Sequence, residues 1–156
     1  MDASQYIPRD KCDLERVDAL IAAGPEAALP ILDRLLPWLQ DINWPVAGRL
    51  AHFLASVGEP LIPHLRPILR SDDDMWIYWI LQDLVAHLPP SLIRQLEPEL
   101  VRLADQAEND HVAFCLLAEA GIWEPAKLKR QLALRISAHE GFLDELRELE
   151  ASLPEA

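Results

Sequence analysis

The stretch PLIPHLRPILRSDDDMWIYWILQDLVAHLPP, residues 60–90, predicts the fold because it contains both helices of one repeating unit. Pro60 can begin a helix, since a residue in the first turn needs no partner for an amide hydrogen. Apolar residues follow at helical spacing, at Leu61, Leu65, Ile68 and Leu69. After the aspartates at 72–74, a second apolar stripe consists of Ile77, Ile80, Leu81, Leu84 and Leu88. We therefore expect two antiparallel helices, each with one apolar face.

The same plan occurs upstream, over residues 13–58, and in a looser copy downstream, over residues 92–121. Pro30 aligns with Pro63 at a spacing of 33 residues, and repeats of this length with two helices each are typical of α-solenoids. Several prolines fall inside the first helix of a unit and bend it: Pro30, Pro37, Pro63, Pro67 and Pro98. Bent first helices are typical of HEAT repeats. The sequence thus predicts an all-α, HEAT-like α-solenoid, a right-handed superhelix of antiparallel helix pairs with about eight or nine helices.

The last segment departs from the repeat. Residues 124–139 are locally basic, and the residues that follow are acidic. An apolar stripe in the acidic part consists of Phe142, Leu143, Leu146 and Leu149. We expect an antiparallel helical hairpin that caps the solenoid, because a terminal repeat needs a polar outer face. The chain is accordingly predicted as one domain, 1–156, with an N-terminal extension (1–12), repeat helices (13–123) and a capping hairpin (124–156).

The acidic composition argues against several classes of function. The 156 residues include 14 Lys and Arg against 26 Asp and Glu, a formal net charge of −12. Such a charge repels phosphate groups, so we expect no binding to nucleic acid or to a membrane, whereas a basic protein partner fits. No apolar run approaches the roughly 18–20 residues of a membrane span, and the N-terminus has no secretory leader. Two distant cysteines, Cys12 and Cys115, indicate a reducing, cytoplasmic setting.

Three strings of residues resemble a known family. They are WLQDINWPVA at residues 38–47, PRDKCD at 8–13 and DDDMWIYWIL at 72–81. These strings are similar to a bacterial family of uncharacterised HEAT-like helical proteins, domain of unknown function 5071. The resemblance covers roughly residues 6–120 and implies a helical-repeat fold. It implies no activity.

No motif in the sequence predicts catalysis or cofactor binding. The chain has no glycine-rich phosphate loop and no serine elbow, so we expect no cofactor. Its histidines lack the spacing of a metal site, and we expect no metal: they are His52, His64, His87, His111 and His139. Asp72, Asp73 and Asp74 are read as residues that begin a helix, where carboxylates satisfy free amide groups and complement the helix dipole.

Two surfaces are candidates for binding. Trp79 and its neighbour Tyr78 fall opposite the apolar stripe of their helix, and we expect them to pack across the small residues Ala47, Ala51 and Ala55. The alternative is that Trp79 and Tyr78 line an exposed groove together with Arg49, His52 and Asp83.

The second candidate surface is an edge formed by the turns of successive units. It would align Gln40, Asp41, Asn43 and Trp44 with Asp72, Asp73, Asp74 and Trp76, and these with Asn109, Asp110 and His111. We interpret these residues as solvated helix caps. The alternative is an acidic edge that receives a basic peptide.

These observations favour a non-enzymatic protein–protein interaction module, an acidic platform for an unknown partner. One alternative is a toxin-neutralising antitoxin or immunity protein, whose acidic edge would mimic a charged substrate. The other is an enzyme with a site near Trp79 and Asp83, in which a buried aspartate acts as a general base.

Overall fold

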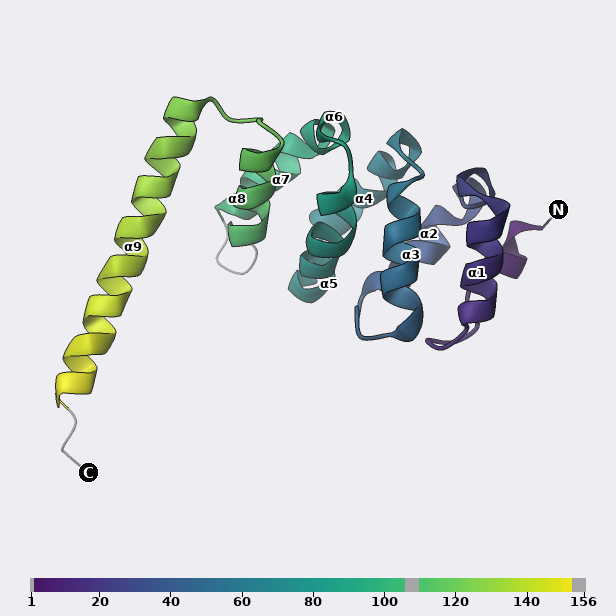
Figure 1. Cartoon of the computed structure of the whole chain (residues 1–156), viewed down its shortest axis with the longest axis horizontal. Coiled ribbons are helices and arrows are strands. Elements are labelled where there is room, and N and C mark those ends of the chain that lie inside the picture. Colours follow the sequence, from purple (N-terminus) through teal and green to yellow (C-terminus); the bar gives the residue numbers. More distant parts are fainter. Residues whose placement is uncertain (1, 106–109, 153–156) are drawn as a thin grey trace. The chain divides into compact units, whose positions relative to one another are not determined.

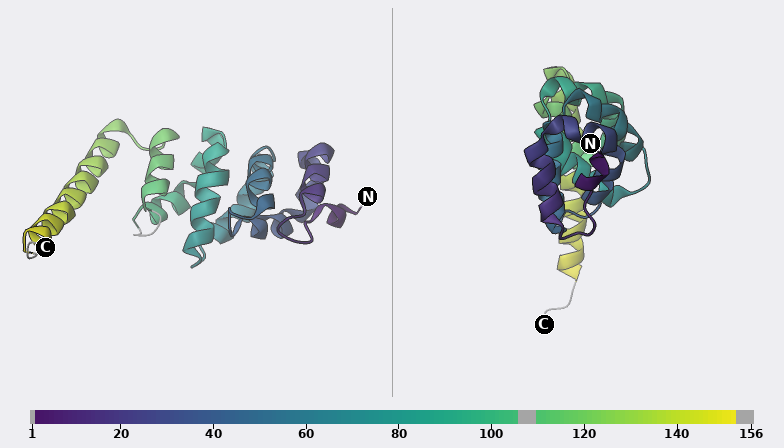
Figure 2. Two further views of the ribbon diagram at one scale, coloured as in Figure 1. Left: turned by 60° about the horizontal axis from the view of Figure 1, so that its bottom comes forward. Right: turned by 90° about the vertical axis from the view of Figure 1, so that its right-hand side faces the viewer.

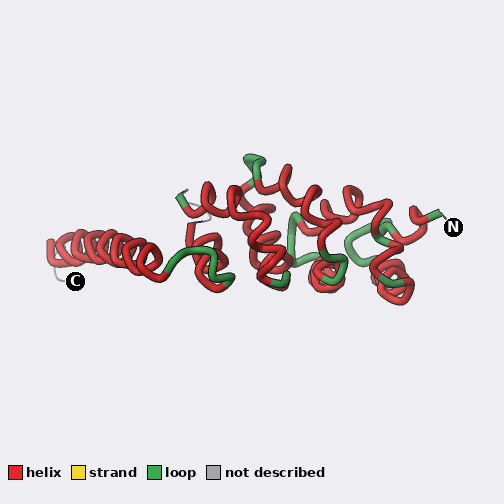
Figure 3. Tube along the Cα trace, turned by 90° about the horizontal axis from the view of Figure 1, so that it is seen from above, coloured by secondary structure: helices red, strands yellow, loops and turns green. Residues whose placement is uncertain are grey.

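The computed structural model describes residues 2–105 and 110–152. Throughout these residues the chain forms helices and connecting turns, and no strand occurs in them (Figure 3). The all-α prediction is therefore confirmed for the described part of the chain. The contacts divide the chain into two compact units, Met1–Ile122 and Trp123–Ala156, although the sequence predicted a single domain.

The first unit consists of two rows of helices (Figure 1). The front row contains α1 (Leu14–Ala23), α3 (Pro45–Ala55), α5 (Asp74–Trp79) and α8 (Asp110–Glu119). Behind it lie α2 (Leu32–Leu35), α4 (Ile62–Leu69) and α7 (Glu97–Ala104), and α6 (Pro90–Ile93) precedes α7. The two rows separate when the unit is seen along its length (Figure 2). The chain thus alternates between the rows, as antiparallel neighbours must.

Proline divides the rear helices into short pieces. Pro30 lies in the 3-10 helix Leu29–Ile31 and Pro37 in the 3-10 helix Leu36–Leu39, on either side of α2. Pro67 lies inside α4. A proline lacks an amide hydrogen and clashes with the preceding turn, which disfavours regular α-helical bonding, although α4 remains α-helical through Pro67. At Pro30 and Pro37 the predicted bends therefore take the form of changes between 3-10 and α-helical geometry.

The core of the first unit lies between the two rows. Every residue of the two apolar stripes in 60–90 is buried, and Leu65, Leu69, Ile80, Leu81 and Leu84 are completely so. Side chains from the front row (Leu20 and Leu50) and the rear row (Leu35) are equally buried. The helical spacing read from the sequence therefore predicts the core correctly.

The second unit contains one long helix, α9 (Pro125–Ser152), where the sequence predicted a hairpin. The hairpin prediction is wrong because nothing after Pro125 forces the helix to turn back. Gly141 is the one glycine in this segment, and its φ is not positive. A glycine in the interior of a helix costs only about 1 kcal/mol relative to alanine. Helical hydrogen bonding therefore continues through Gly141.

Candidate functional site

An open groove lies between α1 and α3 on the front row. Asp18 and Ile21 of α1 line it, and α3 contributes Gly48, Arg49, His52 and Phe53, followed by Ser56; its volume is about 610 Å³. Ile21 is 41% exposed, which leaves an apolar side chain open to solvent in the groove. Gly48 leaves free space, since a Cβ at that position would meet no atom within 4 Å.

One ion pair spans the groove. The Arg49 guanidinium donates a hydrogen bond of 2.6 Å to Oδ1 of Asp18. Both side chains are about half exposed, so the pair contributes little to stability. It joins the two helices while leaving the apolar wall of the groove accessible.

A cluster of ionisable side chains lies beside the groove. The rings of His52 and His87 meet edge to face, with centroids 5.9 Å apart. Asp83 belongs to Ile80–Leu84, a π-helical segment, and such segments often occur at functional sites. Burial raises the pKa of the Asp83 carboxyl, although the nearby His87 opposes the shift. Its Oδ2 atom is buried and has no hydrogen-bond partner among the described residues.

The structure separates the residues that the sequence grouped into one groove. Arg49 and His52 line the groove between α1 and α3, whereas Trp79 and Asp83 are not among its lining residues. Trp79 is half-buried and meets the half-buried Tyr78 edge to face, with ring centroids 4.8 Å apart. The ring of Trp79 is thus neither a fully buried core residue nor part of this groove.

The turns that precede α1, α3 and α5 lie along one edge of the first unit, the lower edge in Figure 1. In the turn before α3, Oδ1 of Asp41 accepts hydrogen bonds from the backbone N–H and from the side-chain amide of Asn43, both 2.9 Å. Trp38 and Trp44 stack edge to face beside this turn, 5.9 Å apart. The cap position of α3 belongs to Trp44, so neither Asp41 nor Asn43 caps this helix.

The turn before α5 contains the three exposed aspartates. Asp73 caps α5, because its Oδ1 accepts a hydrogen bond of 3.0 Å from the Trp76 amide. The capping interpretation is confirmed for this residue. Asp72 and Asp74 are exposed. Of the third predicted turn, residues 106–109 and the side chain of Asp110 lie outside the described residues, and His111 is exposed.

Trp76 lines a depression of about 240 Å³. The other lining residues come from the rear row and its 3-10 segments: Asp33, Leu36, Pro63, His64, Pro67 and Ile68. The indole nitrogen of Trp76 is buried and has no hydrogen-bond partner among the described residues. Trp76 therefore packs mainly as an apolar side chain.

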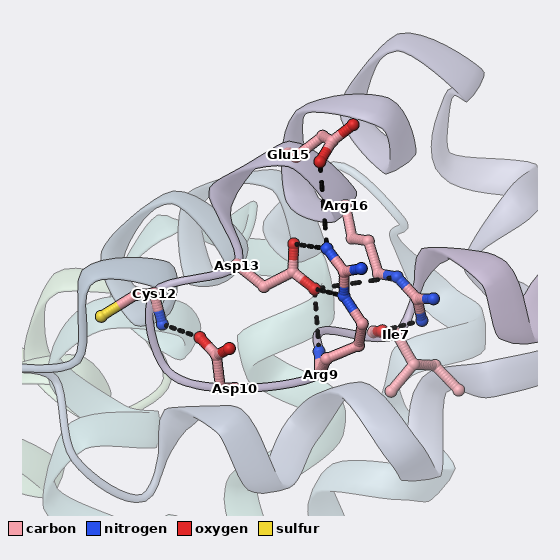
Figure 4. Close-up of polar contacts among 7 residues, drawn as sticks. All are labelled: Ile7, Arg9, Asp10, Cys12, Asp13, Glu15 and Arg16. Carbon is pink, nitrogen blue, oxygen red and sulfur yellow. Dashed lines mark hydrogen bonds and ion pairs between the residues drawn. The ribbon is translucent and has the colours of Figure 1, made fainter.

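A second polar cluster, which the sequence did not predict, fixes the N-terminal segment (Figure 4). The Asp13 carboxylate is 3% exposed and accepts hydrogen bonds from the backbone N–H of Arg9 at 3.0 Å and from its Nε at 2.7 Å. Arg16 approaches the same carboxylate and donates to the Ile7 carbonyl at 2.8 Å. The Arg9 guanidinium, with the Arg9 amide, holds the pKa of Asp13 well below its usual range. Asp13 occupies the N-cap position of α1, but its side chain makes no capping hydrogen bond there and its carboxylate binds Arg9 instead.

Glu99 is the centre of the other buried ion cluster, and the sequence did not predict the residues of this cluster either. Its side chain is 1% exposed and accepts hydrogen bonds from Arg66 at 3.0 and 3.1 Å and from Arg70 at 2.5 Å. Arg66 also donates to the Gln95 carbonyl at 2.7 Å. The two arginines are four residues apart on one helix, and this spacing was the only signal in the sequence. A carboxylate opposite that pair could not be identified without the packing of α7 against α4.

Within the described ranges, no group of three or more His, Cys, Asp or Glu side chains could hold a metal ion. The helices described here include none that is long and apolar enough to cross a membrane.

Two comparisons with known proteins bear on identity. No curated protein matches the chain. The family model described as "Domain of unknown function (DUF5071)" matches residues 6–119, which include the groove, the histidine pair and both buried carboxylates. Because this match spans most of the sequence, the chain belongs to the family of domain of unknown function 5071.

Proposed function

We propose that residues 2–122 form a HEAT-like α-solenoid that acts as a non-catalytic protein-binding module. The solenoid interpretation is supported by contacts that join positions one repeat apart. Arg66 contacts Glu99, and Arg102 donates a hydrogen bond to the Leu69 carbonyl, both at a separation of 33 residues. This is also the spacing of Pro30 and Pro63 in the sequence.

The groove between α1 and α3 carries the binding proposal. It combines an accessible apolar wall of Ile21 and Phe53 with polar groups at its rim, Asp18, Arg49 and His52. A pocket with apolar walls and a few placed polar groups is the usual form of a site that anchors one side chain of a partner. The occupant that fits is a peptide segment with one bulky apolar side chain.

The charge of the first unit favours a basic segment. Residues 1–122 contain 9 Lys and Arg against 19 Asp and Glu, a formal net charge of −10. The exposed Asp72 and Asp74 lie on the edge of the same unit. The electrostatic field of this negative charge accelerates the approach of a cationic partner, and it weakens as salt is added.

The test is a selection of random peptides on the immobilised full chain. We expect enriched peptides to contain Lys or Arg and one bulky apolar residue. Gly48→Leu should weaken their binding by about tenfold or more, because the leucine fills the space that the partner side chain would occupy. This substitution should not unfold α3, since glycine is the less favourable residue in a helix.

Gly48→Ala is the matched control, because it adds a helix-forming residue without filling the groove. It should bind the selected peptides as the wild type does. Asp72→Lys with Asp74→Lys should slow association at low salt and leave it unchanged at high salt. Peptides that bind Gly48→Leu and wild type equally would contradict the groove as the binding site.

The cluster of Asp83, His52 and His87 supports a second candidate function, a hydrolytic enzyme. A buried carboxyl with a raised pKa beside an imidazole is the arrangement of a general base. Asp83 would accept a proton in the rate-limiting step, with His87 and His52 as neighbouring acid–base groups. The test is turnover of chromogenic ester, phosphoester and glycoside substrates. Turnover that disappears in Asp83→Asn while the helical spectrum is unchanged would support catalysis, and no turnover by the wild type would oppose it.

A further inference from the structure

A pocket of about 250 Å³ lies in the rear row where the end of α4 meets α7. Arg70, Pro98, Glu99 and Arg102 line it. Arg70 directly follows α4, and the other three residues belong to α7. Arg70 and Arg102 are exposed, whereas the side chain of Glu99 is 1% exposed. Two solvent-accessible guanidinium groups therefore flank the pocket, with a buried carboxylate between their helices.

Positive charge is in excess at this pocket. Arg66 and Arg70 both bind Glu99, and Arg102 is a third basic side chain beside it. Three arginines and one glutamate give a formal charge of +2, although residues 1–122 as a whole carry 9 Lys and Arg against 19 Asp and Glu. No described carboxylate other than Glu99 lines the pocket. A third of the basic residues of an acidic unit thus gather around one carboxylate.

Contacts within the protein restrain both exposed arginines. Nη2 of Arg70 donates a hydrogen bond of 2.5 Å to Oε1 of Glu99, and its Nε and Nη1 have no partner among the described residues. Nη2 of Arg102 donates to the Leu69 carbonyl. A guanidinium carries five N–H donors, so one contact restrains the group without using all of them. Groups that are already held in place bind a ligand at a smaller entropic cost.

The geometry points to a binding site for a single phosphoryl group, carried as a phosphate monoester on a small molecule or on a phosphorylated side chain of a protein. A phosphoryl group has three acceptor oxygens and a charge of about −1.5 to −2 at pH 7, so it can accept hydrogen bonds from Arg70 and Arg102 at once. A carboxylate has only two oxygens and matches the fork of one arginine. Arginine clusters are a recurring means of recognising phosphorylated ligands.

The charge of the surrounding unit limits the size of the ligand. The excess of positive charge is confined to this pocket, and the rest of residues 1–122 repels a polyanion, so nucleic acid does not fit. The pocket lies between α4 and α7, whereas the groove proposed for peptide binding lies between α1 and α3. The phosphoryl site therefore does not depend on the proposed function.

The test is a titration of the full chain with inorganic phosphate at fixed ionic strength, followed by NMR of the arginine Nε–H groups. We expect the resonances of Arg70 and Arg102 to shift with a Kd of about 1 mM or below, and that of Arg49 in the other groove to stay unchanged. Glycerol phosphate and a phosphoserine peptide then distinguish the two sources. Tighter binding of the peptide identifies a phosphorylated side chain, and tighter binding of glycerol phosphate identifies a small molecule.

A matched pair of variants at Pro98 locates the ligand without disturbing the ion cluster. Pro98 is exposed and is the second residue of α7, where a helix-forming residue is tolerated. Pro98→Glu places a carboxylate beside the two arginines and should weaken phosphate binding by about tenfold or more, because it competes for their donors and repels the ligand. Pro98→Gln has the same shape without the charge and should bind phosphate as the wild type does.

Arg70→Gln should also weaken binding by about tenfold or more, while Arg49→Gln should leave it unchanged. Circular dichroism of each variant verifies that the helices are retained. Three results would overturn the proposal. The first is no shift of the Arg70 and Arg102 resonances at about 20 mM phosphate, twentyfold above the expected Kd. The second is an equal effect of Pro98→Glu and Pro98→Gln. The third is acetate binding as tightly as phosphate, which would identify a general anion site.

Discussion

In the ion cluster of Glu99, Arg66 and Arg70, removing the positive charges should lower the stability of the protein by a different amount than removing the negative charge. Glu99 is almost fully buried, whereas the two arginines are 34% and 60% exposed. Replacing both arginines by methionine leaves a carboxylate in the interior without its partners. Replacing Glu99 by glutamine leaves two guanidinium groups that can reach water. The first change should therefore destabilise the protein much more than the second.

The expected losses of unfolding free energy follow from how deeply each charged group is buried. Removing the partners of a buried charge costs about 3–5 kcal/mol of unfolding free energy. Glu99→Gln keeps a neutral hydrogen-bond acceptor for the arginines. It loses only the extra strength that a charged acceptor gives to these hydrogen bonds, which costs roughly 1–2 kcal/mol. Adding Glu99→Met to the double arginine variant removes the isolated charge. This third substitution should restore stability, because replacing a whole buried ion cluster by apolar residues is often neutral.

Urea unfolding followed by circular dichroism measures these differences. The double variant should also melt roughly 10 °C or more below the wild type. Arg49→Met is the control, since it breaks the half-exposed pair with Asp18 and should cost less than about 1 kcal/mol. If Glu99→Gln costs as much as the double arginine variant, or if Glu99→Met destabilises that variant further, the inference from burial is wrong.

Four further substitutions test other parts of the structure. The raised pKa of Asp83 means that its charged form opposes folding, so Asp83→Asn should stabilise the protein at pH 7, and the difference should shrink as pH falls through that raised pKa. Asp13 has a lowered pKa, and the stability that it adds is present above pH 4 and is lost as pH falls toward the folded-state pKa; Asp13→Asn should therefore remove part of the acid sensitivity of unfolding. Trp79→Ala should cost about 2 kcal/mol in urea unfolding, between the values for a buried and an exposed ring, because the side chain is half-buried. Gly48→Ala should raise the unfolding free energy by about 0.5–1 kcal/mol, since it lies in a helix with free space at its Cβ.

The sequence by itself determined the helices of the first unit and the side of each helix that is buried. Periodicity suffices for this, because Leu65 and Leu84 must face apolar neighbours whichever helices supply them. Proline placement determined where the rear row is broken, since the missing amide hydrogen acts locally. The sequence also determined the N-cap at Asp73, because the amide that its side chain binds is only three residues away.

The tertiary structure decided which polar side chains meet. Glu99 and Arg66 are 33 residues apart, and the exposure of each depends on how α7 packs against α4. The groove between α1 and α3 likewise depends on helix packing, and for that reason Trp79 and Asp83 could be assigned to it in error. In α9 the competition was between a turn and continued helix at Gly141. A single glycine costs a helix too little to decide that competition, so the sequence pattern alone predicted a hairpin where the chain forms one helix.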